Sequence, residues 1–173
     1  MNGPQLAART AGLDNPVMRV GWVLAPAAVA ESLAPVRHAM NFNSTAIDQA
    51  AAAIYLEQVD WQRRTSELRA VYATPMRAMV EGLEAVLPED SSFTRPQGGV
   101  FVWVMLPDGW STTALLERSI EHGFFFMPGT VFLADVPDDR SLRLSISNHT
   151  PETIAEGMSR FEAAIAAMPV EAR

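Results

Sequence analysis

Lysine and cysteine are both absent from this chain of 173 residues, so its 13 basic residues other than histidine are all arginine. Without cysteine there is no disulfide, no thiolate nucleophile and no thiolate-bound metal. Without lysine, no side chain can form an imine with a carbonyl compound. The three histidines, His38, His122 and His149, are too far apart in sequence to show a metal-ligand spacing. We therefore expect neither a structural metal nor a self-contained imine chemistry.

Excess positive charge and long apolar runs are also missing. The net charge is -7, with 20 acidic residues against 13 arginines, which disfavours binding to nucleic acid or to anionic membrane surfaces. No run is long enough to span a membrane, and the N-terminus has no signal-peptide pattern. We expect a cytoplasmic protein with neither nucleic-acid nor membrane partners.

The composition is that of a globular protein. Hydrophobic residues make up 49% of the chain and charged residues 19%, and the length fits one domain or one domain with an appendage. Because the apolar fraction is at the high end of ordinary usage, part of the apolar surface is expected to be covered by a partner.

The first quarter of the chain contains a strand that raises a pairing problem. Residues 1–16 have no hydrophobic periodicity, which predicts a loop or a short frayed helix. Residues 17–25, VMRVGWVLA, predict a strand that is apolar on both faces except at Arg19. Such a strand needs a neighbour. A separate polypeptide, a second copy of this chain, or refolding of the region onto the domain formed by the C-terminal part of the chain would each provide one.

Three helical segments follow. Residues 26–34 predict a short helix, after which Pro35 restarts the chain into a helical segment that continues through residues 44–58. Either Ser44 or Thr45 is expected to cap that alanine-rich run. Residues 61–88 form an amphipathic pattern with apolar residues at spacings of three and four. This long helix is expected to be kinked or split at Pro75.

The second half changes to a strand period. Four segments predict strands, at residues 91–96, 98–107, 123–129 and 141–148. A helix at 111–123, capped by Ser111 or Thr112, and a last helix at 150–168, with Thr150 as N-cap, are interleaved with them. The predicted fold class is α/β, of the α+β small-domain kind. We expect a small, mostly antiparallel sheet covered on one face by helices, with a long amphipathic helix and an N-terminal strand.

The order of these segments closely resembles a known family. A strand with an arginine, an alanine-rich helix and a long amphipathic helix precede TRPQGGVFVWVMLP, GFFFMPGTVF and LRLSISNHTPETIAEGMSRF. This series resembles the C-terminal part of the class I and II aminotransferases of fold type I, which use pyridoxal phosphate. The resemblance covers roughly residues 16–168, and it is nearest to the aromatic and 2-aminoadipate aminotransferases and their regulator relatives.

The resemblance implies roles for several residues. Pro16 and Arg19 match the loop and the arginine that binds the cofactor phosphate, and Arg143 matches the arginine that takes the substrate α-carboxylate. Gly98 and Gly99 match a glycine pair that opens a core strand. The resemblance also implies that residues 1–40 are a remnant of the cofactor-binding large domain and that residues 41–173 are the small domain.

The departures from the family pattern bear on catalysis. The family's lysine lies seven residues before the phosphate-binding arginine, and here that position is Gly12. The rest of the cofactor domain has no counterpart in the sequence. Pyridoxal phosphate, if it binds, is therefore not held covalently by this chain. A partner chain that supplies the large domain, or a homo-oligomer, is expected.

The candidate residues also have ordinary structural interpretations. The arginine fork of Arg143 suits a small-molecule carboxylate, but a pair with Asp135, Asp138 or Asp139 is an alternative.

His122 and His149 are expected to be structural, whereas His38, Asn41 and Asn43 are a possible pocket lining. The aromatic residues Trp22, Phe101, Trp103 and Phe124 to Phe126 are expected in the core.

Three functions follow from these observations. The first is an aminotransferase-like domain that binds a pyridoxal-type or amino-acid carboxylate ligand, has no catalytic lysine of its own and is completed by a partner chain. The second is a free-standing, repurposed domain that binds or acts on an amino-acid-derived metabolite without pyridoxal phosphate. The third is an inactive oligomeric remnant. The sequence assigns no catalytic residue.

Overall fold

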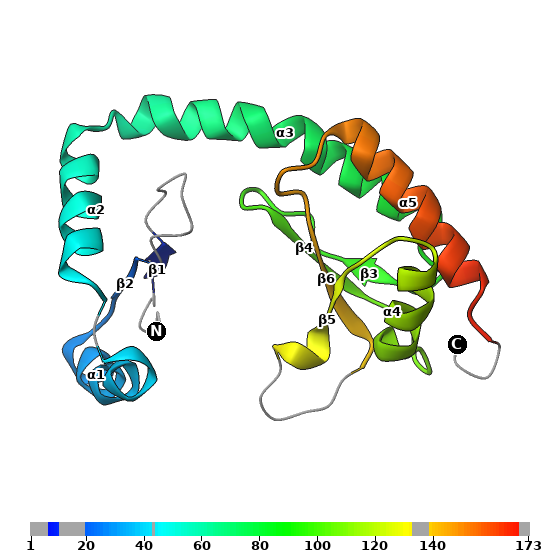
Figure 1. Ribbon diagram of the computed structural model, residues 1–173, viewed down its shortest axis with the longest axis horizontal. Helices are drawn as coiled ribbons and strands as arrows, with labels where there is room; N and C mark the ends of the chain where they lie inside the picture. Colours follow the sequence, from blue (N-terminus) through cyan, green and yellow to red (C-terminus); the bar gives the residue numbers. More distant parts are fainter. Residues whose placement is uncertain (1–6, 11–19, 43, 133–138, 170–173) are drawn as a thin grey trace, which may run out of the picture. The chain divides into compact units, whose positions relative to one another are not determined.

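The computed structural model describes residues 7–10, 20–42, 44–132 and 139–169, apart from the side chains of residues 7–10, Trp22 and Asn41. The chain divides into two compact units, Met1–Trp61 and Gln62–Arg173 (Figure 1). The assignment of residues 1–40 and 41–173 to large and small domains concerns the correspondence with aminotransferases, and it stays a prediction.

The first unit contains a two-stranded antiparallel ribbon. Strand β1, Ala7–Thr10, pairs with β2, Gly21–Leu24, in a register that places Ala7 opposite Leu24. The prediction of loop or helix for residues 1–16 was therefore wrong at β1, because strand pairing overrides the weak local preference of Ala-Ala-Arg-Thr. The partner of β2 lies in the same unit, which none of the three expected solutions included. Arg19 and the residues before it, back to residue 11, lie outside the described part.

Two helices complete the first unit. Helix α1, Ala27–Asn41, begins after Pro26 and runs through Pro35 without a break. The predicted end of the helix before Pro35 was wrong, because the surrounding helix-forming residues sustain the helix across the one hydrogen bond that proline removes. Helix α2, Ala46–Gln58, begins after Thr45, whose hydroxyl accepts the Asp48 N–H at 3.1 Å. Thr45, rather than Ser44, is therefore the cap.

Helix α3, Trp61–Val86, is the longest element, and all of it after Trp61 belongs to the second unit. It continues through Pro75, so the predicted split did not occur. Met79 and Leu83 of its apolar stripe are buried, while Tyr72 and Met76 pack partly against the core. The amphipathic pattern thus placed the correct face toward the core.

The second unit is built on a four-stranded antiparallel sheet. Its strands are β3, Ser92–Phe93, β4, Phe101–Met105, β5, Met127–Pro128, and β6, Ser141–Ser145. Their spatial order is β3-β4-β6-β5. The long pairing of β4 with β6 forms the middle of the sheet, with Trp103 opposite Arg143. The predicted small antiparallel sheet is confirmed.

Two further helices lie with α3 against this sheet (Figure 1). Helix α4, Thr112–Glu121, has Ser111 as its N-cap and His122 as its C-cap. Helix α5, Pro151–Ala166, begins after Thr150, whose hydroxyl accepts the Thr153 N–H at 3.3 Å. The caps at Ser111 and Thr150 are as predicted, and each satisfies an N–H that would have no partner within the helix.

The core occupies one face of the sheet. Val102 and Val104 of β4 and Leu142 and Leu144 of β6 are buried, and they join residues of α3, α4 and α5 in one cluster. Because side chains alternate along a strand, the intervening residues point to the opposite face. We call this the outer face; it carries Phe101, Trp103, Arg143 and Ser145.

The aromatic residues are divided between core and surface. Phe126 is buried as expected, and its ring contacts that of Phe161. Phe101 is 44% exposed and Phe125 is 64% exposed, so the expectation that both are core residues was wrong. Phe101 alternates away from the core, and Phe125 lies before β5 begins.

In the part of the chain that the structure describes, no helix has the length and apolarity to cross a membrane.

Candidate functional site

Arg143 lies in the middle of the outer face. Strand β6 has a neighbour on each side, and Arg143 is paired with Trp103 of β4 and with Met127 of β5. Its neighbours in sequence, Leu142 and Leu144, are buried on the core face, which forces the arginine side chain to the other side. The side chain is half-buried there. A central strand thus gives this cation a rigid base.

Two aromatic rings contact the guanidinium group of Arg143. Its Cζ atom is 4.1 Å from the ring centroid of Phe101 and 4.1 Å from that of Phe132. Among the described residues, no ring contact joins Phe101 to Phe132. The ring of Trp103 meets that of Phe132 edge-on, at 5.3 Å and 76°. These contacts have cation–π geometry.

Arg143 forms no ion pair or hydrogen bond with a described side chain. Asp139, one of the three carboxylates that could have paired with it, is used elsewhere. The other two, Asp135 and Asp138, lie outside the described residues. The N–H groups of the Arg143 guanidinium are therefore not paired with any described carboxylate.

Asp139 instead anchors the start of α4. Its carboxylate accepts hydrogen bonds from the hydroxyls of Ser111 at 2.5 Å, Thr112 at 2.8 Å and Thr113 at 2.8 Å, and from the Thr113 N–H at 3.0 Å. Partial burial acts to raise the pKa of Asp139, but these donors outweigh it and leave the pKa below its ordinary value. The local sequence around the start of α4 does not indicate Asp139 as a capping residue, because Asp139 comes 18 residues after the end of the helix at Glu121.

The described structure does not place the other predicted site residues together with Arg143 in one site. Arg19 and Asn43 lie outside the described residues, and Asn41 is described only as the last residue of α1. His38 is exposed on α1, with its ring 4.7 Å from that of Phe42. Arg143 belongs to the second unit and His38 to the first. A pocket formed by His38, Asn41 and Asn43 stays a prediction.

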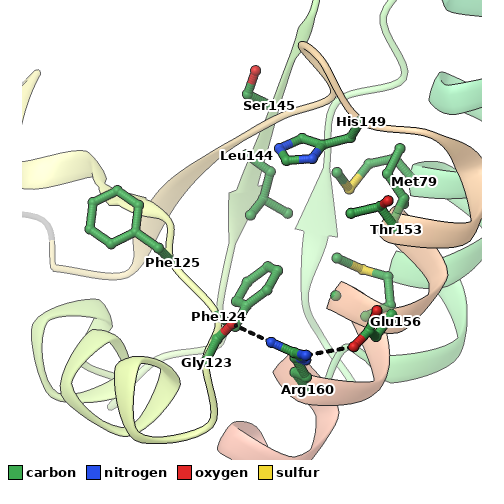
Figure 2. Close-up of a pocket in the computed structure, with 13 residues that line it drawn as sticks. Met79, Gly123, Phe124, Phe125, Leu144, Ser145, His149, Thr153, Glu156 and Arg160 are labelled. Carbon is green, nitrogen blue, oxygen red and sulfur yellow. Dashed lines mark hydrogen bonds and ion pairs between the residues drawn. The ribbon is translucent and has the colours of Figure 1, made fainter.

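A separate pocket of about 470 Å³ lies where α5 passes the segment before β5 (Figure 2). His149 and Ser145 lie at one end of it, and Arg160 lies at the other, where it donates to the Gly123 carbonyl at 3.1 Å and pairs with Glu156 at 2.5 Å. The positive charge of Arg160 is thus already paired with Glu156. Arg143 does not line this pocket. No pattern in the sequence indicates this pocket, because its lining residues come from segments that are distant along the chain.

The donor set of the outer face suits a carboxylate. A planar guanidinium can form two parallel charge-assisted hydrogen bonds to a carboxylate, and these are stronger where neighbouring rings reduce contact with water. Within residues 7–10, 20–42, 44–132 and 139–169, no group of three histidine or acidic residues is arranged to hold a metal ion. The guanidinium of Arg143 is the group on this face whose chemistry suits an anion.

Comparison with known proteins gives a consistent result. The profile of the family "Aminotransferase class I and II" matches residues 16–161. The 2-aminoadipate transaminase of Thermus thermophilus is 30% identical over 151 residues, which are 87% of this chain and 38% of that protein. Aromatic-amino-acid aminotransferase 1 of Thermococcus litoralis is 28% identical over 84% of this chain and 35% of its own length.

A solved structure shows the same fold. The crystal structure of α-aminoadipate aminotransferase from Thermus thermophilus, complexed with N-(5'-phosphopyridoxyl)-L-leucine, has a TM-score of 0.70 at 30% identity. The match covers 87% of this chain and 39% of that one. The chain thus spans less than half the length of the relatives that it matches. Since the profile extends over most of the sequence, the chain belongs to the class I and II aminotransferase family.

Proposed function

We propose that this chain binds the carboxylate of a pyridoxal-type or amino-acid ligand through Arg143, as part of an aminotransferase-like site that a partner chain completes. The observation that carries the proposal is the state of Arg143 in a member of this family. It is half-buried on a central strand, in cation–π contact with two rings and without an ion pair to any described carboxylate. A cation held in this way and left without an internal counter-charge favours an external one.

The fit to the cofactor itself is partial. Pyridoxal phosphate supplies an electron sink for transamination, and the enzyme must also provide a lysine and a phosphate site. The described residues provide neither the lysine nor the phosphate site, since the sequence has no lysine and Arg19 lies outside the described part. What they fit is the amino-acid end of such a ligand. Arg143 binds and orients that end, and the proposal assigns no proton transfer to this chain.

The surface of the first unit supports completion by a partner. Only one hydrophobic residue of this unit, Ala52, is buried among those described. Met40 is 81% exposed, Phe42 73% and Ile47 82%. Large apolar side chains are rarely left in contact with water over a whole unit. We infer that a polypeptide carrying the remaining aminotransferase segment, with its lysine, covers this surface.

The free-standing alternative has its own supporting observation. The second unit contains its own hydrophobic core and also carries Arg143 with both stacked rings. The carboxylate site thus needs no residue of the first unit. In this second candidate, the domain binds an amino-acid-derived carboxylate without pyridoxal phosphate.

A calorimetric titration tests the carboxylate site. The purified chain is titrated with N-(5'-phosphopyridoxyl)-L-leucine, which needs no lysine for its formation, and with L-leucine and pyridoxal phosphate separately. We expect saturable binding of the first ligand, weakened at least tenfold in Arg143→Gln, because a charge-assisted bidentate pair is lost. Arg118→Gln is the matched control, since Arg118 is an exposed arginine paired with Glu121 on α4.

The ligands separate the two candidates. Binding of the pyridoxyl compound alone supports the partner-completed site, whereas equal binding of L-leucine supports the free-standing domain. Absence of binding by every ligand, or equal binding by wild type and Arg143→Gln, would contradict both.

A further inference from the structure

We infer that Phe101 and Phe132 are positioning residues that hold the guanidinium plane of Arg143 ready for a carboxylate, and that Gly129 sets the place of Phe132. The inference rests on the proposed carboxylate role of Arg143. It goes further in assigning a task to two aromatic side chains and one glycine that do not themselves supply a charge.

Phe101 reaches Arg143 across the central strand pair. Phe101 is paired with Ser145 and Trp103 with Arg143, so Phe101 lies one diagonal step from the arginine on the same face. Side chains in this diagonal relation can touch when they are long or aromatic. The ring is 44% exposed and contributes little to the core. Its contact with the guanidinium, at 4.1 Å, is therefore its main interaction on the outer face.

Phe132 reaches the guanidinium by a different route. It follows the short 3-10 helix η2, Gly129–Val131, and its N–H donates to the Gly129 carbonyl at 2.8 Å. The residue just before η2, Pro128, is paired with Leu142 of β6. The turn is thus attached to the same strand that carries Arg143. Phe132 is brought over the guanidinium as a consequence.

Gly129 makes this attachment possible. A Cβ atom at position 129 would lie 1.8 Å from Ser141 Oγ, 2.8 Å from Ser141 Cβ and 2.9 Å from the Ser141 carbonyl oxygen. These distances are too short for any side chain, and two of the atoms belong to parts of Ser141 that cannot rotate away. Only glycine therefore lets the turn lie directly on β6. Any larger residue would push Phe132 away from Arg143.

The two rings reduce the freedom that Arg143 would lose on binding. An unrestrained arginine side chain has many accessible rotamers. Contacts with two rings restrict the guanidinium before a ligand arrives, so less rotamer entropy is lost in the complex. The N–H donors of a guanidinium lie along the edge of its plane. A carboxylate lying in the guanidinium plane meets this edge directly.

Nuclear magnetic resonance of the full chain, without ligand, tests the geometry. With rings over the guanidinium, the side-chain N–H resonances of Arg143, assigned by their loss in Arg143→Gln, should be shifted upfield by the ring currents. The upfield shift should shrink in Phe132→Leu and in Phe101→Leu and persist in Phe132→Tyr. Phe125→Leu is the matched control, because Phe125 is an exposed ring with no contact to Arg143.

The same variants are then titrated with N-(5'-phosphopyridoxyl)-L-leucine. We expect Phe132→Leu and Phe101→Leu each to bind about 3- to 10-fold more weakly, with Phe132→Tyr and Phe125→Leu near wild type. Gly129→Ala should match Phe132→Leu in both measurements. Because Gly129→Ala also disturbs the contact between the turn and β6, the result for Phe132→Leu decides the outcome.

The results separate this inference from the proposed function. If Arg143→Gln abolishes binding while Phe132→Leu and Phe101→Leu bind as wild type, the positioning role is overturned and the carboxylate site stands. If the upfield shift is absent, the ring arrangement itself is wrong. If neither the wild type nor any variant binds the ligand, the proposed function fails and the positioning role fails with it.

Discussion

The units Met1–Trp61 and Gln62–Arg173 contain the same kinds of elements but bury their side chains very differently. Of the 17 buried hydrophobic residues described, 16 lie in the second unit and only Ala52 lies in the first. The helices of the first unit are nevertheless regular, and α2 even has a side-chain cap at Thr45.

The difference shows which interactions hold each unit. In the second unit, packing between sheet and helices provides most of the stability, as in ordinary domains. In the first unit, helix propensity, caps and one strand pair form the elements, and these contributions are small in water without tertiary burial. The second unit thus has a hydrophobic core of its own, whereas the described residues of the first unit bury almost no apolar side chains.

The largest expected effect comes from the core of the second unit. Phe161 is fully buried, and its ring is 4.9 Å from that of Phe124. Phe161→Ala should lower the free energy of unfolding by about 3–5 kcal/mol, because it removes apolar contacts and leaves a cavity. Urea unfolding followed by circular dichroism measures this change.

The matched variant in the first unit is Ile47→Ala. Ile47 is 82% exposed, so its truncation should change the free energy of unfolding by less than about 0.5 kcal/mol in the isolated chain. A large loss from Ile47→Ala would show that this side chain is already covered, and the contrast between the units would not hold.

The next largest effect concerns the acid dependence of the second unit. Asp139 has a pKa held below its ordinary value by four hydrogen bonds at the start of α4. A carboxyl whose folded pKa is lowered stabilises the fold above its unfolded pKa, which is about 3.9. That stabilisation is lost as the pH falls through the folded pKa. Asp139→Asn should therefore cost about 1–2 kcal/mol at neutral pH and progressively less below about pH 4.

Unfolding midpoints measured from neutral to acidic pH test this dependence. Asp108→Asn is the control, since the Asp108 side chain is 96% exposed although it pairs with Arg140. The Asp139 curve should converge with wild type at low pH and the Asp108 curve should stay close to wild type throughout. Parallel wild-type and Asp139→Asn curves would show that the charge of Asp139 is not what anchors α4.

The sequence predicted the second unit better than the first, for a physical reason. The stripes of α3 and α5 and the caps at Ser111 and Thr150 are local signals, and the structure agrees with them. Pro35 predicts a break and Pro75 a kink or a split, whereas both lie inside continuous helices, so neither divides its helix. Strand β1 was missed because its pairing with β2 depends on residues about 14 positions away.

The candidate site shows the same division. Arg143 was found through its resemblance to a family motif, yet its place on the outer face depends on the alternation around Leu142 and Leu144. The sequence pattern predicts Phe101 in the core and indicates no role for Phe132, whereas the rings of both contact the guanidinium of Arg143. Contacts of this kind depend on a turn lying against a strand, and no periodicity in the sequence indicates them.

The smallest expected effect compares the same cap in both units. Thr150 caps α5 in the second unit, and Thr45 caps α2 in the first. Thr150→Ala should lower the free energy of unfolding by about 1 kcal/mol, because α5 is packed on the core and its loss of a cap is felt by the whole domain. Thr45→Ala removes an equivalent hydrogen bond from a helix with little tertiary burial.

The two threonine variants should therefore differ in what they change. Thr45→Ala is expected to reduce the helical circular dichroism signal of the folded chain and to leave the main unfolding midpoint unchanged. Hydrogen exchange should locate the change in α2, while Thr150→Ala should weaken protection across α5 and the sheet together. If Thr45→Ala lowers the main midpoint as much as Thr150→Ala does, the two units unfold as one cooperative body, and the first unit needs no partner to be held in place.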